Sequence, residues 1–86
     1  MLNSTINVAL ESSIPKPRLT HVCQGQRIRF YNATYRKLRL TWEDAPSGHK
    51  SDIRPGAISI QTFSQLGAFI YHYGERDTQT GIVRVE

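Results

Sequence analysis

Short runs in which apolar and polar residues alternate recur along the whole chain, and clusters of Gly, Pro, Asn and Ser separate them. Alternation with a period of two is typical of a β-strand with one buried face, and no segment keeps a helical period. The strands predicted from this pattern are residues 5–10, 19–22, 26–31, 38–42, 57–63, 67–73 and 80–85. We therefore expect an all-β domain, either a Greek-key sandwich of about seven strands or a small closed barrel.

Within these strands the alternation predicts which side chains face the core. In the third strand, Ile28 and Phe30 alternate with Arg27 and Arg29, so the two arginines should point to solvent. The side chains expected in the core include Ile28, Phe30, Trp42, Phe69, Tyr71 and Tyr73. The hydroxyls of Tyr71 and Tyr73 are expected to reach the rim of the domain.

Two segments break the alternation. Neither Pro15 nor Pro17 has a backbone N–H to donate to a sheet ladder, so this segment should lie at an edge or in a crossing. Residues 43–53 have no periodicity and are rich in Asp, Pro, Ser, Gly, His and Lys. We expect a long loop there, and long loops often carry function.

The length and composition favour one small domain without an enzymatic cavity. The 86 residues should form a single domain over 1–86, because a second core could not bury enough apolar surface. A hydrophobic content of 38% supports a thin core but leaves little material around a deep pocket. We therefore do not expect an enzyme.

The charge favours an acidic partner. The chain has a net charge of +4, from eleven Lys and Arg against seven Asp and Glu. If the third and fourth strands are neighbours, their outward arginines could form one cationic patch with tyrosines beside it. The expected partner-binding residues are Arg27, Arg29, Arg39, Tyr31 and Tyr35. The favoured partner is a protein with an acidic surface, nucleic acid is second, and an ordinary solvated face is the alternative.

The compartment stays open at this stage. The single cysteine, Cys23, cannot close an intrachain disulfide. No apolar run is long enough to span a membrane, and residues 1–10 lack the pattern of a signal peptide. We expect either a cytoplasmic protein or a domain excised from an exported one.

Several short motifs follow one another in an order that can be compared with known families. They are Val22-x-x-Gly25-x-x-Ile28-x-Phe30, Phe30-Tyr31-Asn32, Ser51-Asp52-Ile53-Arg54-Pro55-Gly56, Gly67-Ala68-Phe69-Ile70-Tyr71-His72-Tyr73 and Gly81-Ile82-Val83-Arg84-Val85. In this order and at these separations they resemble the cupredoxin family, of the plastocyanin and azurin type, over nearly the whole chain. The resemblance implies a cupredoxin-like sandwich.

The resemblance also implies where copper ligands would stand. Family members that hold copper use two histidines, a cysteine and a methionine. The corresponding positions here are Leu38, Tyr73, Arg76 and Gln79. A blue-copper centre needs two imidazoles and a thiolate, which these side chains cannot replace. We therefore expect no cofactor and no electron transfer.

Three functions remain as hypotheses. The favoured one is a non-catalytic, metal-free module that acts in protein–protein interaction or assembly through an arginine-rich sheet face or the 43–53 loop. The second is a copper or other metal protein with a rearranged site drawn from His21, Cys23, His49 and His72. The third is a small nucleic-acid-binding barrel that uses the same arginines.

Overall fold

The computed structural model describes residues 4–43, 50–75 and 78–86. Within these residues the chain forms nine strands. They are β1 (Thr5–Leu10), β2 (Pro15–Lys16), β3 (Leu19–Val22), β4 (Arg27–Asn32), β5 (Leu38–Trp42), β6 (Lys50–Ile53), β7 (Ile58–Thr62), β8 (Gly67–Tyr73) and β9 (Gln79–Val85). In this part of the chain no helix has the length and apolar character needed to cross a bilayer.

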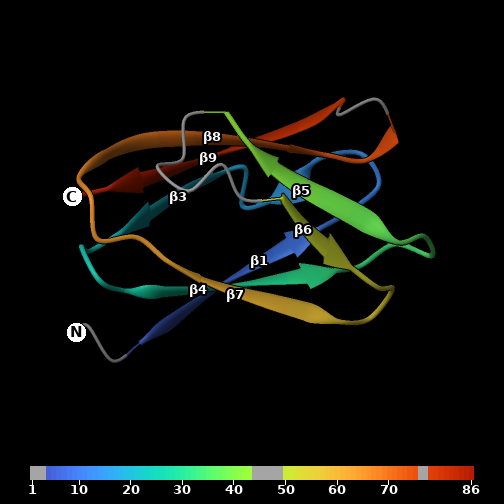
Figure 1. Cartoon of the computed structure of the whole chain (residues 1–86), viewed down its shortest axis with the longest axis horizontal. Coiled ribbons are helices and arrows are strands. Elements are labelled where there is room, and N and C mark those ends of the chain that lie inside the picture. Colours follow the sequence, from blue (N-terminus) through green and yellow to red (C-terminus); the bar gives the residue numbers. More distant parts are fainter. Residues whose placement is uncertain (1–3, 44–49, 76–77) are drawn as a thin grey trace.

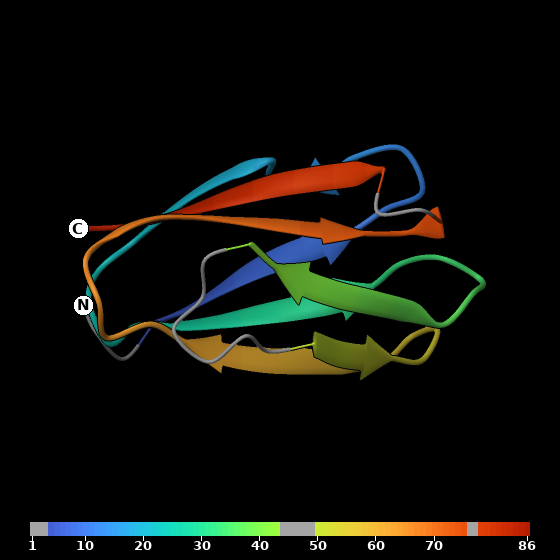
Figure 2. The same ribbon diagram turned by 45° about the horizontal axis from the view of Figure 1, so that its top comes forward.

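The strands form two sheets that pack face to face (Figure 1 and Figure 2). The four-stranded sheet has the order β2-β1-β4-β7, and the five-stranded sheet has the order β3-β9-β8-β5-β6. The pairs β1–β4 and β3–β9 are parallel, and the other pairs are antiparallel. The predicted all-β sandwich is confirmed, and the closed barrel is wrong because the strands divide into two separate sheets.

All seven predicted strands are present, and two short ones are added. The prolyl segment forms β2, an edge strand that pairs with Ala9 and Leu10 of β1, as the proline rule required. The prediction of an uninterrupted loop over 43–53 is wrong, because residues 50–53 form β6 and pair with β5. Ile53 is buried in the core there, which fixes the strand. Residues 44–49 of the predicted loop lie outside the described residues.

The core lies between the sheets and is rich in aromatic rings. Trp42 packs at its centre, with ring centroids 5.8 Å from Phe30, 4.9 Å from Phe63 and 5.0 Å from Tyr71. The pairs with Phe30 and Phe63 are edge to face, and such pairs each add about 0.5–1.5 kcal/mol beyond the burial of their area. The buried residues include every predicted core residue, together with Val8, Leu10, Val22, Leu38, Leu40, Ile53, Phe63, Val83 and Val85.

The two core tyrosines differ in where their hydroxyls end. The Tyr73 hydroxyl donates to the Glu11 carbonyl at 2.7 Å, at the rim where it was predicted. The Tyr71 hydroxyl does not reach the rim, because its ring lies over Gly81 inside the sandwich. A Cβ at Gly81 would come within 2.1 Å of the Tyr71 ring, so this position requires a residue without a side chain.

The loops gather at the two ends of the sandwich. The β1–β2, β4–β5 and β6–β7 connections lie at one end, on the right of Figure 1, together with the end of β8. The turn at Cys23–Gln26 and the β7–β8 connection lie at the other end, where Gln24 Nε2 donates to the carbonyl of Ser64. The loop-rich end is therefore a surface separate from the outer faces of the two sheets.

Candidate binding surfaces

The predicted arginine patch is divided between opposite sides of the molecule. Arg27 and Arg29 lie on β4 in the four-stranded sheet, and Arg39 lies on β5 in the five-stranded sheet. The outward side of each strand faces solvent on its own side of the sandwich. The prediction of one shared patch is therefore wrong, because the chain crosses from one sheet to the other between residues 32 and 38.

On the five-stranded sheet, two arginines have carboxylate partners. Arg39 Nε lies 2.9 Å from Asp52 Oδ1, and this hydrogen bond holds the pKa of Asp52 below its usual range. His72 contacts Glu43 through Nε2 and Thr80 through Nδ1. The ion pairs on this side include Arg39–Asp52 and Arg84–Glu86. Arg39 and Arg84 therefore each have an acidic neighbour on this side.

The outer side of the four-stranded sheet has a different charge pattern, and we call it the basic face. The strand registers define nine outward positions on β1, β4 and β7. They are Thr5, Asn7, Ala9, Arg27, Arg29, Tyr31, Ile58, Ile60 and Thr62, and none is acidic. Among the described residues, Arg27 and Arg29 have no ion-pair partner.

The strand β7 exposes the apolar side that a surface strand normally buries. Ile58 and Ile60 are 49% and 52% exposed, and they lie opposite Tyr31 and Arg29 in the register. The intervening Ser59 and Gln61 point inward, where Gln61 Nε2 donates to Ser51 Oγ of β6 at 3.2 Å. A slip of one residue would bury the isoleucines, so the register itself keeps them at the surface.

Sequence reasoning missed Ile58 and Ile60 as surface residues. Apolar side chains occur at both parities of the segment 57–63, since Ala57 and Phe63 alternate with the isoleucines. The available signal was the polar character of Ser59 and Gln61, which share the parity of the buried Phe63. Pairing with β4 then decides which set faces out.

Tyr35 lies in neither sheet face but in the β4–β5 loop, where its side chain is fully exposed. The loop is held by Asn32, which is completely buried. Its Nδ2 donates to the carbonyls of Arg36 and Ile53 at 2.7 and 2.8 Å, and its Oδ1 accepts from Thr34 N and Oγ1 at 2.9 and 2.7 Å. Tyr35 is therefore presented by an ordered turn.

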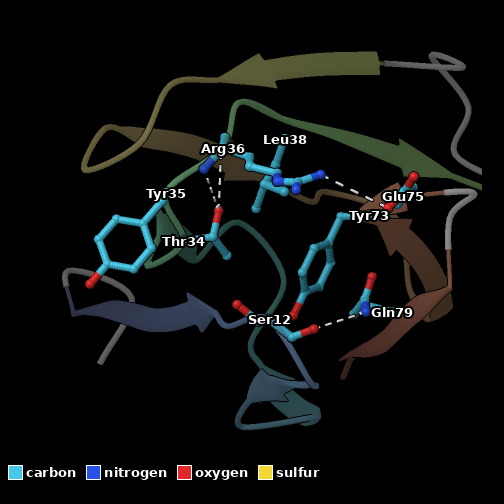
Figure 3. A pocket seen from close by; sticks show the side chains of 9 residues that line it. Ser12, Thr34, Tyr35, Arg36, Leu38, Tyr73, Glu75 and Gln79 are labelled. Atoms are coloured by element: carbon cyan, nitrogen blue, oxygen red, sulfur yellow. Dashed lines mark hydrogen bonds and ion pairs between the residues drawn. The ribbon is translucent and has the colours of Figure 1, made fainter.

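Three of the four copper-ligand positions line one pocket at this loop-rich end, which we call the rim pocket (Figure 3). Its volume is about 270 Å³, and Leu38, Tyr73 and Gln79 line it with Ser12, Tyr35 and Arg36. The fourth position, Arg76, lies outside the described residues. Leu38, Tyr73 and Gln79, which the comparison with cupredoxins grouped by position, therefore lie around one pocket in the structure.

These three side chains do not fit a copper ion. Leu38 has no donor atom, and the Tyr73 hydroxyl is occupied with the Glu11 carbonyl. Burial raises the pKa of Tyr73, which keeps the phenol neutral. The amide of Gln79 donates to the Ser12 carbonyl at 2.9 Å. No imidazole or thiolate is present among them, so these three positions do not supply the donor set of a blue-copper centre.

The residues of the alternative metal site are not brought together. His21 is level with Ala68 across β9, whereas His72 is four residues further along β8. Two strand spacings and four residues of rise separate these histidines by about 16 Å. Cys23 is an exposed free thiol beyond the end of β3, and His49 lies outside the described residues. In the described chain no group of three His, Cys, Asp or Glu side chains could hold a metal ion.

Comparison with known proteins gives a consistent result for the fold. No protein-family model matches the sequence, and neither does any curated protein. Among solved structures, the Cu(I) form of a methionine-to-alanine variant of amicyanin matches with a TM-score of 0.86 and 19% identity, over 100% of this chain and 86% of that one.

Two further structures extend the comparison. A purple cupredoxin from Nitrosopumilus maritimus matches with a TM-score of 0.80 and 13% identity, over 94% of this chain and 99% of that one. A copper-containing nitrite reductase from Thermus scotoductus SA-01 matches with a TM-score of 0.80 and 16% identity, over 96% of this chain but 22% of that one. Together with the two-sheet topology, these matches identify the chain as a protein with a cupredoxin-like fold.

Proposed function

We propose that this chain is a non-catalytic module that binds an acidic protein surface through the basic face. The observation that carries the proposal is the combination of exposed Ile58 and Ile60 with Arg27 and Arg29, which have no ion-pair partner among the described residues. An apolar centre beside arginine and tyrosine is typical of protein interfaces. Tyr31 completes the set, at 43% exposure.

The charge of the basic face favours an acidic partner. A second copy of this chain would bring its own Arg27 and Arg29 against the first pair, and like charges in contact weaken association. An acidic surface would instead supply the carboxylates that these arginines lack within the described residues. On the opposite sheet, Arg39 already has Asp52 as its partner, so an acidic protein would gain less from contacting Arg39.

The apolar residues favour protein over nucleic acid. Single-stranded nucleic acid is held by several aromatic side chains on which bases stack. The nine outward positions of β1, β4 and β7 include one aromatic residue, Tyr31, but two isoleucines. The side chains of Ile58 and Ile60 cannot donate hydrogen bonds to phosphate, whereas they can pack in the apolar centre of a protein interface.

The size of the basic face predicts a weak complex. A strand of six residues is about 20 Å long, and the three strands β1, β4 and β7 together are about 15 Å wide, so the face covers roughly 300 Å². A standard interface buries about 800 Å² on each partner. We therefore expect a transient complex, with electrostatic attraction that increases the association rate.

Comparative capture from an extract of the source organism tests the proposal. The immobilised chain is compared with the double variant Arg27→Glu/Arg29→Glu, the double variant Ile58→Ser/Ile60→Ser and the control Arg39→Glu, after nuclease treatment. All of these positions are on the outer surface, so circular dichroism should show unchanged folding. A protein captured by the wild type is then purified, and its Kd is measured for each variant.

Both double variants are expected to raise Kd at least about tenfold, and Arg39→Glu is expected to change it by less than about twofold. Added salt should weaken binding of the wild type more than that of the arginine variant. The proposal fails if Arg39→Glu is as damaging as the double variants. It also fails if nuclease removes the captured material, since the partner would then be nucleic acid.

A further inference from the structure

The strand β7 has a free main-chain edge beside the basic face. It is the last strand of the four-stranded sheet, and among the described residues only β4 pairs with it (Figure 1). Asn32 N donates to the carbonyl of Ala57 at 3.0 Å, so the main-chain groups of Ala57 and of every second residue after it point toward β4. Those of Ile58, Ile60 and Thr62 therefore point away from the sheet, and the described backbone hydrogen bonds outside the ladders do not include them.

Of the four edge strands that the structure describes, β7 lacks the features that protect an edge. Proteins prevent the addition of foreign strands by prolines, by charged side chains or by very short edges. The strand β2 has two residues and starts at Pro15, β3 follows directly on Pro17 and Arg18, and β6 contains Asp52. The strand β7 has five residues, none of which is charged or a proline. An extended segment of another chain can therefore pair with β7 through main-chain hydrogen bonds.

The side chains around this edge favour a segment with apolar and acidic residues. A strand added to β7 would place every second side chain on the basic face, next to Ile58 and Ile60. Apolar side chains there would cover the two isoleucines, which are about half exposed. An acidic side chain there would lie two strand spacings, about 10 Å, from Arg29, and extended arginine and glutamate side chains can together span this distance. On the inward side the segment would meet Ser59 and Gln61, which suit small polar side chains.

We propose that the free edge of β7 takes an extended acidic segment of the partner protein as an added strand. This inference rests on the proposed function, because the same isoleucines and arginines supply the side-chain contacts. The added strand would enlarge the contact beyond the roughly 300 Å² of the basic face and would supply partners for the outward main-chain groups of β7. A second copy of the chain fits less well, because its own β7 has no acidic residue to approach Arg27 or Arg29.

Matched peptides test the main-chain pairing, because their side chains are identical. The probe is a blocked peptide with the repeat Thr-Leu-Thr-Glu, which places leucine and glutamate on one side of a strand and threonine on the other. One modified peptide carries an N-methyl group on every leucine and glutamate, and the other carries it on every threonine. In an added strand, alternate N–H groups point toward β7 and away from it, so only one of the two modifications disturbs the pairing.

We expect the unmodified peptide to bind saturably to the ¹⁵N-labelled protein and to protect the outward amides of β7. At a peptide concentration of about ten times Kd, exchange of the Ile58, Ile60 and Thr62 amides with water should slow about tenfold. The Ser59 and Gln61 amides already face β4 and should change little. One methylated peptide should bind within about threefold of the unmodified one, and the other should bind at least about tenfold more weakly.

Failure of this proposal can be told apart from failure of the proposed function. Equal binding of the two methylated peptides, or unchanged exchange of the three outward amides, would overturn the strand addition. If the unmodified peptide still loses its binding in the double variant Arg27→Glu/Arg29→Glu, the proposed function stands and only the strand addition fails. Equal affinity of that variant for the peptide would overturn the acidic character of the segment. Sedimentation of the protein alone should show a monomer; a dimer that slows exchange of the same three amides would overturn the proposal, because a second copy would then occupy the edge.

Discussion

Replacement of Asn32 by alanine should destabilise the domain strongly, although it removes only one polar side chain. Asn32 is completely buried at the end of β4 and makes four side-chain hydrogen bonds. They connect the β4–β5 loop, through Thr34 and Arg36, with Ile53 at the end of β6. Asn32→Ala removes all four and leaves the buried Ile53 carbonyl without the donor that now satisfies it.

The size of the effect follows from these contacts. Each hydrogen bond contributes about 1 kcal/mol net, and a buried carbonyl left without a donor costs about 1–3 kcal/mol. Because some of the freed groups can reach water, we expect a loss of about 3 kcal/mol in the free energy of unfolding. That is a large share of the roughly 5–15 kcal/mol that stabilises a domain.

Urea denaturation measures this loss directly. With a slope of about 1 kcal/mol/M for a chain of this size, the midpoint should fall by about 3 M. The Tm should fall by roughly 12–24 °C. Asn7→Ala, an exposed asparagine on β1, is the control and should lie within about 0.5 kcal/mol of the wild type. If Asn32→Ala is as stable as Asn7→Ala, the assignment of Asn32 as the residue that orders the β4–β5 loop is wrong.

Further predictions concern packing and ionisation. Gly81→Ala places a Cβ against the Tyr71 ring and should cost about 2–3 kcal/mol in denaturant unfolding; its combination with Tyr71→Ala should cost less than the sum, and strict additivity would contradict the contact. Arg39→Gln should raise the pKa of Asp52 toward its ordinary value of about 3.9 in an NMR titration, because the hydrogen bond from the guanidinium that lowers it is gone. In the wild type, the pair stabilises the folded state above pH ~4, and this stabilisation is lost as the pH falls through the lowered pKa of Asp52. An unchanged pKa of Asp52 in the variant would refute the pairing. Burial raises the pKa of Tyr71 and of Tyr73, so these two phenols should leave the free energy of unfolding unchanged below pH ~10 and lower it as the pH rises above that value. The urea midpoint should therefore fall less with rising pH in Tyr73→Phe than in the wild type. An equal fall in both would contradict this account.

Local patterns in the sequence were sufficient for the strands and for most of the core. In β4, Ile28 and Phe30 alternate with Arg27 and Arg29, and the structure buries the two apolar residues and exposes the two arginines. Where a strand has one apolar side, an alternation with a period of two determines which side chains point into the core. The β6 strand was missed because it is short and its buried residue Ile53 follows a polar run.

The candidate surfaces depend on information that alternation does not contain. Arg39 and Arg29 have the same local pattern, yet they lie on opposite outer faces because the chain changes sheets between them. The sheet to which a strand belongs is decided by pairings distant in sequence, such as β1 with β4. Tyr35 was expected beside the arginines but lies at the rim, since the Asn32 hydrogen bonds that hold its loop involve β6 as well.

The copper-ligand positions show what a resemblance adds to such patterns. Composition and alternation contain no signal that Leu38, Tyr73 and Gln79 should meet, but the positional comparison with cupredoxins grouped them, and they line one pocket. The same comparison could not say what the pocket does. Its charge pairing and its ordered Tyr35 were visible only with side chains in place.

The central claim is that the basic face is where this cupredoxin-like module meets its partner. Amide shifts of the ¹⁵N-labelled protein, followed during titration with a synthetic peptide in which glutamate alternates with leucine, test it most directly. We predict shifts concentrated on β1, β4 and β7, and their loss in the double variant Arg27→Glu/Arg29→Glu. Shifts concentrated on β5, β8 and β9, or equal shifts in that variant, would contradict the claim.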